Sequence, residues 1–568
     1  MSQVHYEVYV RKPGSPSWTL ELASEDRSRA METAEELLAT GKVSAFRVTK
    51  EVLEEDTNAF KSVNILTKGD VGKADKKKKE RDLAPLCVSP QDLYTIHARD
   101  VIGRLLEAWL ARERATPFEL LHRAELIEKL DAAGMDLQHA IQKVAIPEAQ
   151  DRGTSVHEII RHFQSLTQAS IDRVLRDDRK GFFPDLESET FARACERIVD
   201  HGEPGYVLGG AVAKIIGRAV TWGDKVNRLL DLADAAPREP KARALAFQIL
   251  EIPLAEILGS KVGMAALLGQ GLDLGGNLAA MTRLAAADTV DALAAIEPTV
   301  ARLMPTLDGA AARLANWLEG DKFPSVRSAL SQRVLHELAI PRRLRPDDPE
   351  GEIEILRALA MCLTAAAGKH LPLEQVQHAF TERSKMLIRA DFVESYLGEG
   401  RAPLEEVQAL TWLAENVTGA ANKRGASHWI SSRITGLKFE RDLRAATDSP
   451  ATRLAALAGI QKSVARVGFV PEELAPLQNK IGEIGGLIEA DTKLVALIVR
   501  SKMSTANRLT ALLKMAAGET APLGPVADRA KAEVLKMTRA PEVRAELAKA
   551  PEQLDAVRGL LQSAGLAA

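Results

Sequence analysis

The sequence predicts a mainly α-helical protein that begins with a small ββαββ module. Residues 4 to 66 alternate apolar and polar side chains with the period of strands, whereas the later segments repeat apolar residues at three- and four-residue spacings. Aromatic residues make up only 4% of the chain, and Ala, Leu, Glu and Arg are abundant, which favours helices over sheets. We therefore expect an α+β module followed by an extended multi-helical, repeat-like body, built as an α-solenoid or a bundle.

The N-terminal module is predicted from four strands and one helix. VHYEVYV and SWTLEL alternate in polarity and are separated by a turn rich in Pro, Gly and Ser, which indicates a hairpin. Ser24 is the expected N-cap of a helix that stops at Gly41. VSAFRVTKE and FKSVNIL supply two more strands. A unit of this size leaves little room for a deep active site, so we expect it to have a docking or sensing role.

A lysine-rich segment follows the module. It contains Lys76, Lys77, Lys78 and Lys79 and almost no apolar residue, so it cannot bury enough surface to fold and is predicted to be a solvated linker. The alternative is that these lysines bind a phosphate backbone or an acidic partner. No aromatic residue lies among them to stack on bases, which favours the linker interpretation.

The helical body is divided by turns that contain Pro, Gly or Asp. Ser89 before Pro90 and Thr116 before Pro117 are helix-start signals, and residues 340 to 352 are the clearest break. Short connections favour antiparallel neighbours. We predict a module at 1–68, a linker at 69–82, a helical bundle at 83–230, a repeat-like region at 227–340, a helical region at 341–448 and a second repeat-like region at 449–568.

Four stretches of the body resemble one another. Each carries Arg-Leu at or next to its start, and they begin at Asn227, Arg313, Arg453 and Asn507. A helix-turn-helix unit cannot bury its apolar face alone, so repeated units would stack into one helical body. Any two amphipathic helices rich in Ala, Leu and Arg also align fairly well, so duplication and chance similarity both stay open.

Charge and cysteine content limit the classes of protein. The chain has 75 basic and 78 acidic residues, a net charge of −3, and therefore no overall field that attracts nucleic acid or anionic lipid. Its three cysteines are more than 100 residues apart, which argues against a disulfide framework or a cysteine zinc module. No signal-peptide pattern or long apolar run occurs, so we expect a cytoplasmic protein that is not inserted in a membrane.

The sequence contains no motif of a common enzyme class. The nearest is His157-Glu158 with His162, but a zinc-binding helix needs its second histidine four residues after the first, where this chain has Arg161. His162 is five residues on, which places it about 140° further round the helix. Phosphate-loop, dinucleotide and nucleophile-elbow motifs are also missing. We therefore predict no catalytic residue, no metal ligand and no cofactor, and lean against an enzyme.

The first candidate interaction site is an arginine cluster. Arg342, Arg343 and Arg345 lie between two prolines and could bind a carboxylate or a phosphate. Four acidic residues follow at once, between 347 and 352, so local neutralisation is the favoured interpretation.

The second candidate interaction site combines basic residues with a tryptophan. Lys423, Arg424 and Trp429 lie in a stretch that we interpret as loop-like. Trp beside Arg is a common composition of interface hot spots. The favoured alternative is a Trp that starts the next helix and packs within the protein.

Three functions are consistent with these features. We favour a non-enzymatic interaction or scaffold protein that presents a helical surface to a protein partner. The alternative is an enzyme or small-molecule receptor with a pocket among residues 83–230, where many histidines gather: His97, His122, His139, His157, His162 and His201. A weaker alternative is nucleic-acid association through the lysine-rich linker, which we do not expect.

Overall fold

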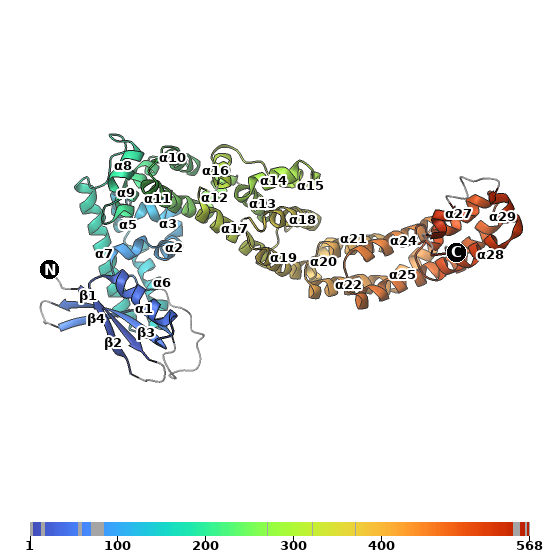
Figure 1. The fold of residues 1–568 in the computed structure, drawn as a ribbon, viewed down its shortest axis with the longest axis horizontal. Coiled ribbons are helices and arrows are strands. Elements are labelled where there is room, and N and C mark those ends of the chain that lie inside the picture. Colours follow the sequence, from blue (N-terminus) through green and yellow to red (C-terminus); the bar gives the residue numbers. More distant parts are fainter. Residues whose placement is uncertain are drawn as a thin grey trace. The chain divides into compact units, whose positions relative to one another are not determined.

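The computed structural model describes residues 4–12, 17–54, 59–69, 85–269, 271–320, 322–369, 371–548, 557–562 and 565–566. The chain is mainly α-helical with an α+β N-terminus, which confirms the predicted fold class (Figure 1). It divides into two compact units, residues 1–270 with 308–326, and residues 271–307 with 327–568. Within the described ranges, no helix combines the length and the apolar character that crossing a membrane requires.

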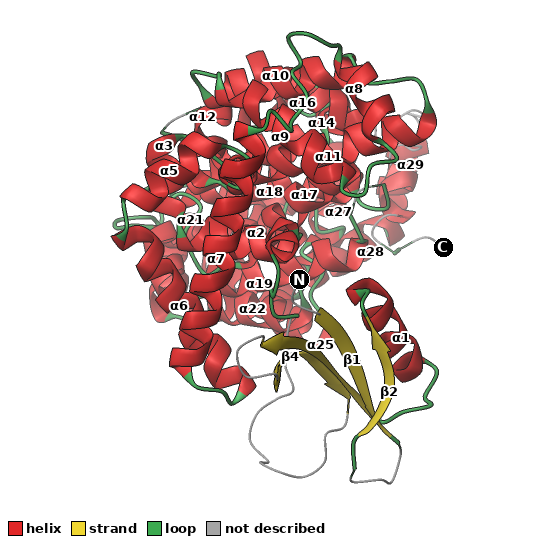
Figure 2. Cartoon of the chain, turned by 90° about the vertical axis from the view of Figure 1, so that its left-hand side faces the viewer, coloured by secondary structure: helices red, strands yellow, loops and turns green. Residues whose placement is uncertain are grey.

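The N-terminal module is a four-stranded antiparallel sheet with one helix against it (Figure 2). Its strands are β1 (Val4–Arg11), β2 (Thr19–Ser24), β3 (Ala45–Glu54) and β4 (Ala59–Gly69), in the order β2-β1-β3-β4. The helix is α1 (Arg27–Ala39). This is the ββαββ arrangement that the alternating sequence predicts.

The predicted N-cap of α1 was wrong by two residues. The Asp26 carboxylate caps the helix, because its Oδ1 accepts hydrogen bonds from the amides of Ser28 at 2.8 Å and Arg29 at 3.4 Å. Strand β2 continues through Ser24, so the helix starts later than the sequence suggests. The Ser24 hydroxyl instead accepts a hydrogen bond from the Asp26 amide at 3.1 Å.

The core of the module extends beyond its own strands and helix. Val8 and Phe46 are fully buried on the face that α1 covers, and they share one apolar cluster with Leu86 and Val88. Two hydrogen bonds fix this later segment to the sheet. The Leu86 amide donates to the Ile65 carbonyl at 3.1 Å, and Lys50 Nζ donates to the Val88 carbonyl at 3.1 Å. Residues 85–88 therefore pack with the module, although in the sequence they directly precede the helical part.

The rest of the first unit is helical. It begins with the 3-10 turn η1 (Pro90–Tyr94) and contains α2 (Ile96–Leu105), α3 (Glu107–Glu113), α4 (Pro117–Leu120), α5 (Ala124–Ala132), α6 (Met135–Arg152), α7 (Val156–Arg179), α8 (Phe191–Ile198), α9 (Pro204–Gly217), α10 (Trp222–Asp234), α11 (Pro240–Gly259), α12 (Lys261–Leu268) and α16 (Gly309–Glu319).

The helix start predicted at Thr116 and Pro117 is confirmed, and a capping box stabilises it. The Thr116 hydroxyl accepts from the Glu119 amide at 3.2 Å, and the Glu119 carboxylate accepts from the Thr116 amide at 3.1 Å.

The second unit is helical throughout its described residues. Its helices are α13 (Leu274–Ala285), α14 (Ala287–Ala294), α15 (Pro298–Leu303), α18 (Pro349–Ala366), α19 (Leu373–Leu387), α20 (Ala390–Leu397), α21 (Pro403–Glu415), α22 (Ala420–Ile434), α23 (Leu437–Ala445), α24 (Pro450–Arg466), α25 (Pro471–Thr492), α26 (Leu494–Arg500), α27 (Thr505–Ala516), α28 (Pro525–Arg539) and α29 (Pro541–Ala548). Helix α17 (Pro324–Ala339) runs through the point in the chain where the two units divide.

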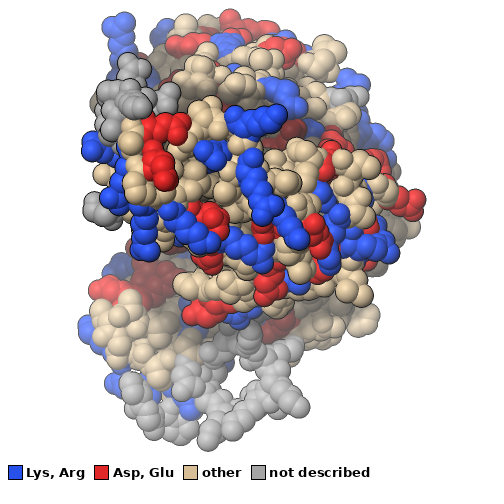
Figure 3. All heavy atoms as spheres, turned by 90° about the vertical axis from the view of Figure 1, so that its right-hand side faces the viewer, with Lys and Arg blue, Asp and Glu red and all other residues tan. Residues whose placement is uncertain are grey.

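The four similar stretches each fold as two consecutive helices, which are α10 and α11, α16 and α17, α24 and α25, and α27 and α28. Two helices in a row are what the sequence predicts for each stretch, and their origin by duplication stays a prediction. Basic and acidic side chains are interspersed over the face drawn in Figure 3, in keeping with the nearly balanced charge of the sequence.

Candidate functional site

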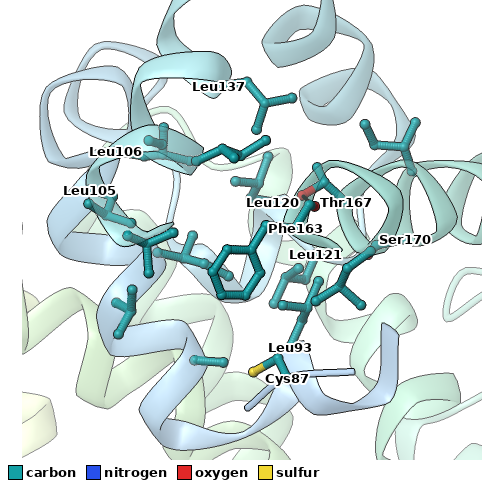
Figure 4. Close-up of a pocket in the computed structure, with 18 of the residues that line it drawn as sticks. Cys87, Leu93, Leu105, Leu106, Leu120, Leu121, Leu137, Phe163, Thr167 and Ser170 are labelled. Atoms are coloured by element: carbon teal, nitrogen blue, oxygen red, sulfur yellow. Dashed lines mark hydrogen bonds between the residues drawn. The ribbon is translucent and has the colours of Figure 1, made fainter. Parts of the chain in front are cut away.

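An apolar cavity of about 210 Å³ lies in the helical part of the first unit (Figure 4). Its walls come from residues 85–87, η1, α2 and α4 to α7. Most of the side chains that line it are aliphatic, and Phe163 is the aromatic one among them. A concave, mainly apolar pocket with a few polar groups is the usual form of a small-molecule site.

The helical period explains why these residues meet. On α7 the lining residues are Phe163, Leu166, Thr167, Ser170 and Ile171, which recur at three- and four-residue intervals and so form one stripe along the helix. Helices α2 and α6 contribute stripes with the same spacing, from residues 97–105 and 137–148. Each helix turns its apolar stripe inward, and the cavity is the space that these stripes leave unfilled.

The segment before η1 forms one wall of the cavity. Pro85, Leu86 and Cys87 line it, and the Cys87 carbonyl lies 2.8 Å from His162 Nε2 on α7. The segment is therefore held between the sheet on one side and α7 on the other. Burial raises the pKa of the Cys87 thiol, so this thiol is kept protonated and is a poor nucleophile.

The polar side chains that line the cavity differ in their hydrogen-bond partners. The Thr167 hydroxyl donates to the Phe163 carbonyl at 2.7 Å. Glu148 accepts two hydrogen bonds from Arg152, at 2.9 and 2.7 Å. Ser170 is only 4% exposed, and none of the described residues hydrogen-bonds its hydroxyl. The described residues that line the cavity include no Lys and no Arg.

The structure does not gather the histidines of residues 83–230 in one pocket. Of the six, His97 lines the cavity, while His139, His157 and His201 are exposed on the surface. The remaining two are His162, bonded to the Cys87 carbonyl, and His122, which is buried elsewhere. Among the described residues, no group of three or more His, Cys, Asp or Glu side chains could hold a metal ion.

His122 lies in a buried aromatic cluster. Its ring is 4.6 Å from that of Phe118, 5.1 Å from Tyr94 and 5.5 Å from Tyr206, measured between centroids. Nδ1 lies 2.7 Å from the Phe118 carbonyl, and Nε2 has no hydrogen-bond partner in the described structure. Burial lowers the pKa of His122 to about 4. A Cβ at Gly209 would come 2.6 Å from Nε2, so glycine there lets α9 approach the ring.

Buried ion pairs flank this cluster. Lys225 Nζ lies 2.5 and 2.6 Å from the two carboxylate oxygens of Glu119, and both side chains are almost fully buried. Glu256 accepts from Arg99 Nε at 2.8 Å and from the Phe118 amide at 2.7 Å. Burial raises the pKa of Glu256 to about 7 against the lowering effect of Arg99. These pairs join α4 to α10 and α2 to α11, so their position indicates a structural role.

The predicted arginine cluster lies between α17 and α18 and is largely neutralised. Arg343 Nε lies 2.7 Å from the buried Glu352 carboxylate, and Arg345 Nε lies 3.3 Å from Asp273. Arg342 is exposed, and its carbonyl accepts from the buried Arg383 at 2.6 Å. The three arginines are therefore not grouped as a free anion site.

The loop-like interpretation of the stretch around Trp429 was wrong, because this stretch lies inside α22. Gly425 does not mark a turn, since a Cβ there would come 2.8 Å from Ile388 Cδ1, and glycine allows close packing instead. Lys423 Nζ donates to the carbonyls of Ala414 at 2.6 Å and Val467 at 2.8 Å. Trp429 Nε1 donates to the Ile388 carbonyl at 2.9 Å.

Arg424 is the exposed member of this group, and it pairs with Glu473 at 2.7 Å. Trp429 lies in the middle of α22 and is partly buried, so it does not start a helix as the favoured alternative has it. The use of Lys423, Arg424 and Trp429 as an interaction site stays a prediction. The four lysines of the predicted linker, Lys76 to Lys79, lie outside the described residues.

The sequence suggested a pocket among residues 83–230 with histidines in it, but it did not identify the aliphatic residues that form the cavity. The apolar stripes of α2, α6 and α7 are visible in the sequence, but their mutual register is not. No known protein family, curated protein or solved structure matches this chain.

Proposed function

We propose that the first unit binds a small apolar molecule in the cavity lined by residues 85–171. The observation that carries this proposal is the cavity itself, about 210 Å³ with mainly aliphatic walls. Apolar cavities of ~150 Å³ stay dry and take up benzene-sized molecules. The volume here is larger, so it accommodates a molecule of at least that size.

The free energy available for binding comes from burial of apolar surface. Each buried CH₂ group contributes about 0.8 kcal/mol, so a six-carbon molecule gains about 5 kcal/mol, equivalent to a Kd of ~0.2 mM. The protonated Cys87 thiol and the exposed His97 favour binding over catalysis at this site. The proposed function therefore corresponds to the small-molecule receptor that the sequence suggested, beside an enzyme, for a pocket among residues 83–230.

A cavity-filling substitution tests this function. Ala140 lines the cavity on α6, and Ala140→Phe is expected to weaken binding of benzene or hexane at least about tenfold while leaving the melting temperature unchanged or higher. Isothermal titration calorimetry measures the binding. Gln142→Phe, on an exposed position of the same helix, is the matched control and should bind like the unmodified protein. If the unmodified protein binds neither probe, the cavity is not a ligand site.

A second candidate function, protein binding, is favoured by a groove in the second unit. The groove has a volume of about 640 Å³. Its apolar lining includes Leu293 on α14, Ile296 just after α14, Leu356 and Met361 on α18, and Phe380 on α19. Ile296 is 78% exposed, so the groove has an uncovered apolar edge. This fits the prediction of a helical body that presents a surface to a protein partner.

The charges of the groove favour a basic amphipathic helix as the partner. Glu297 and Glu415 are half-buried in its lining, and neither forms an ion pair with a described residue. Arg357, the cation among the described lining residues, already stacks 4.9 Å over the Trp412 ring. A basic side chain beside the apolar face of a bound helix would therefore meet Glu297, which has no ion pair with a described residue, and Glu415, whose charge also interacts with Lys423.

Peptide binding measured by fluorescence anisotropy tests the groove. An amphipathic Leu/Lys peptide is expected to bind and a Leu/Glu counterpart is not, and Glu297→Gln with Glu415→Gln should weaken the Leu/Lys peptide about tenfold. Glu399→Gln, at an exposed position of the same unit, should leave binding unchanged. Equal binding of the two peptides would exclude this recognition.

A further inference from the structure

We infer that the ligand of the first-unit cavity is an uncharged aliphatic molecule whose single oxygen hydrogen-bonds the Ser170 hydroxyl. This inference rests on the proposed function of the cavity and names the chemical class of its ligand. Its observations are the free hydroxyl of Ser170, the charges of the lining and the size of the cavity.

Ser170 lacks the hydrogen bond within the helix that several other buried hydroxyl side chains make, and Thr282 on α13 lacks it too. A serine or threonine inside a helix commonly donates to the carbonyl four residues earlier. Thr167 does so to Phe163 at 2.7 Å, and the buried Ser384 and Thr411 likewise donate to the carbonyls four residues earlier, at 2.8 Å. No described residue accepts a hydrogen bond from Ser170. This side chain lines the cavity and is only 4% exposed.

A ligand that covered this hydroxyl without pairing with it would leave it unsatisfied, which is costly. A ligand oxygen placed beside Ser170 would accept a hydrogen bond from this hydroxyl, or donate one to it if the oxygen is a hydroxyl. The Thr167 oxygen lies one turn away on the same stripe of α7, with its hydrogen already donated to Phe163. Ser170 is thus a hydroxyl of the lining that is free to recognise a polar atom, and it is buried, whereas the other unpaired polar side chains, His97 and Asp131, are exposed.

The charges of the lining disfavour a charged ligand. An anionic head group would meet the carboxylates of Asp131 and Glu148 with no lysine or arginine among the described lining residues. A cationic head group would find Glu148 already paired with Arg152 at 2.7 Å, and Asp131 exposed to water. Burying either charge in an apolar cavity without a partner is unfavourable. A neutral oxygen avoids both costs.

The volume limits the length of the ligand. Since ~150 Å³ accommodates the six carbons of benzene, a cavity of about 210 Å³ holds roughly six to eight carbons. Uncharged medium-chain alcohols, ketones and esters meet all three conditions. Their aliphatic part would contact the leucine side chains, and their oxygen would lie against α7.

Four probes with the same carbon chain test this inference by calorimetric titration at pH 7. Hexane, 1-hexanol, hexanoate and hexylamine differ only at one end. The full-length protein is expected to bind 1-hexanol about fivefold more tightly than hexane, since a net hydrogen bond contributes this factor. Hexanoate and hexylamine should bind more weakly than either.

The Ser170→Ala variant assigns the preference to its residue. It should lose the fivefold preference for 1-hexanol and keep the affinity for hexane, which also reports that the cavity has remained intact. Thr167→Val is the matched control on the same stripe and should retain the preference, because the Thr167 hydroxyl is already bonded.

The outcomes separate this inference from the proposed function. If none of the four probes binds, both are wrong. If hexane and 1-hexanol bind equally, or a charged probe binds most tightly, the cavity is a ligand site but the assigned ligand class is wrong. Loss of hexane affinity in Ser170→Ala would make Ser170 a structural residue and would also overturn the inference.

Discussion

Replacing Glu119 by Leu is expected to lower the free energy of unfolding of the first unit by about 3–5 kcal/mol. The substitution leaves the Lys225 ammonium, whose side chain is only 3% exposed, without the carboxylate that it contacts at 2.5 Å. It also removes the acceptor of the Thr116 amide at the start of α4. An uncompensated buried charge costs far more than the pair itself contributes. Calorimetric unfolding of the full chain should show the corresponding transition roughly 10 °C lower.

The double variant distinguishes this explanation from a simple packing defect. Glu119→Leu with Lys225→Met removes both charges and is expected to recover part of the lost stability, because apolar residues of similar volume replace buried ion pairs well. The rest is not recovered, since the Thr116 amide and Arg123 still lack the Glu119 carboxylate. The control is Glu187→Gln, which breaks an ion pair with Arg218 whose two side chains are 63% and 51% exposed, and should cost less than about 1 kcal/mol. A double variant as unstable as the single one would contradict the assignment.

Acid is expected to destabilise the first unit through His122. Burial lowers its pKa from 6.5 to about 4, so between these values the unfolded chain binds a proton that the folded chain does not. Stability is therefore complete above pH 6.5 and falls as the pH decreases, by roughly 3 kcal/mol in total at pH 4. Below pH 4, His122 is protonated in both the folded and the unfolded chain, so it no longer makes the free energy of unfolding depend on pH.

Comparison of variants isolates this contribution. The pKa of Glu256 is raised to about 7, so this group alone would make stability fall as the pH rises from 4.5 to 7. Glu256 is present in both the unmodified protein and His122→Leu, and its effect cancels in their difference. Urea unfolding of the unmodified protein and of His122→Leu between pH 4 and 7 should give a difference in the free energy of unfolding that changes over this range. A constant difference for His122→Leu would contradict the buried neutral imidazole.

The sequence predicted the elements whose signals are local. The alternation of Val4 to Val10 defines β1, and the Thr116 to Glu119 capping box defines the start of α4. Local signals failed where tertiary packing decides the outcome. Gly425 looks like a loop residue, yet it lies within α22 because Ile388 packs against it.

The candidate site could not be predicted because it depends on residues distant in sequence. Glu119 is recognisable as a capping residue, but its pairing with Lys225, 106 residues later, requires the fold. Ser170 has no distinctive sequence context, and its significance arises from the unfilled space beside it. The basic residues chosen by composition, such as Lys423, hold helix ends together instead.

The segment at residues 85–88 links the sheet of the N-terminal module to the wall of the cavity. Leu86 packs in the core of the sheet and also lines the cavity. A partner that shifts the sheet on docking would therefore move a wall of the ligand site. By thermodynamic reciprocity, filling the cavity would change the affinity of the sheet for that partner by the same factor. A ligand bound in the cavity would then alter how strongly the small α/β module binds another molecule.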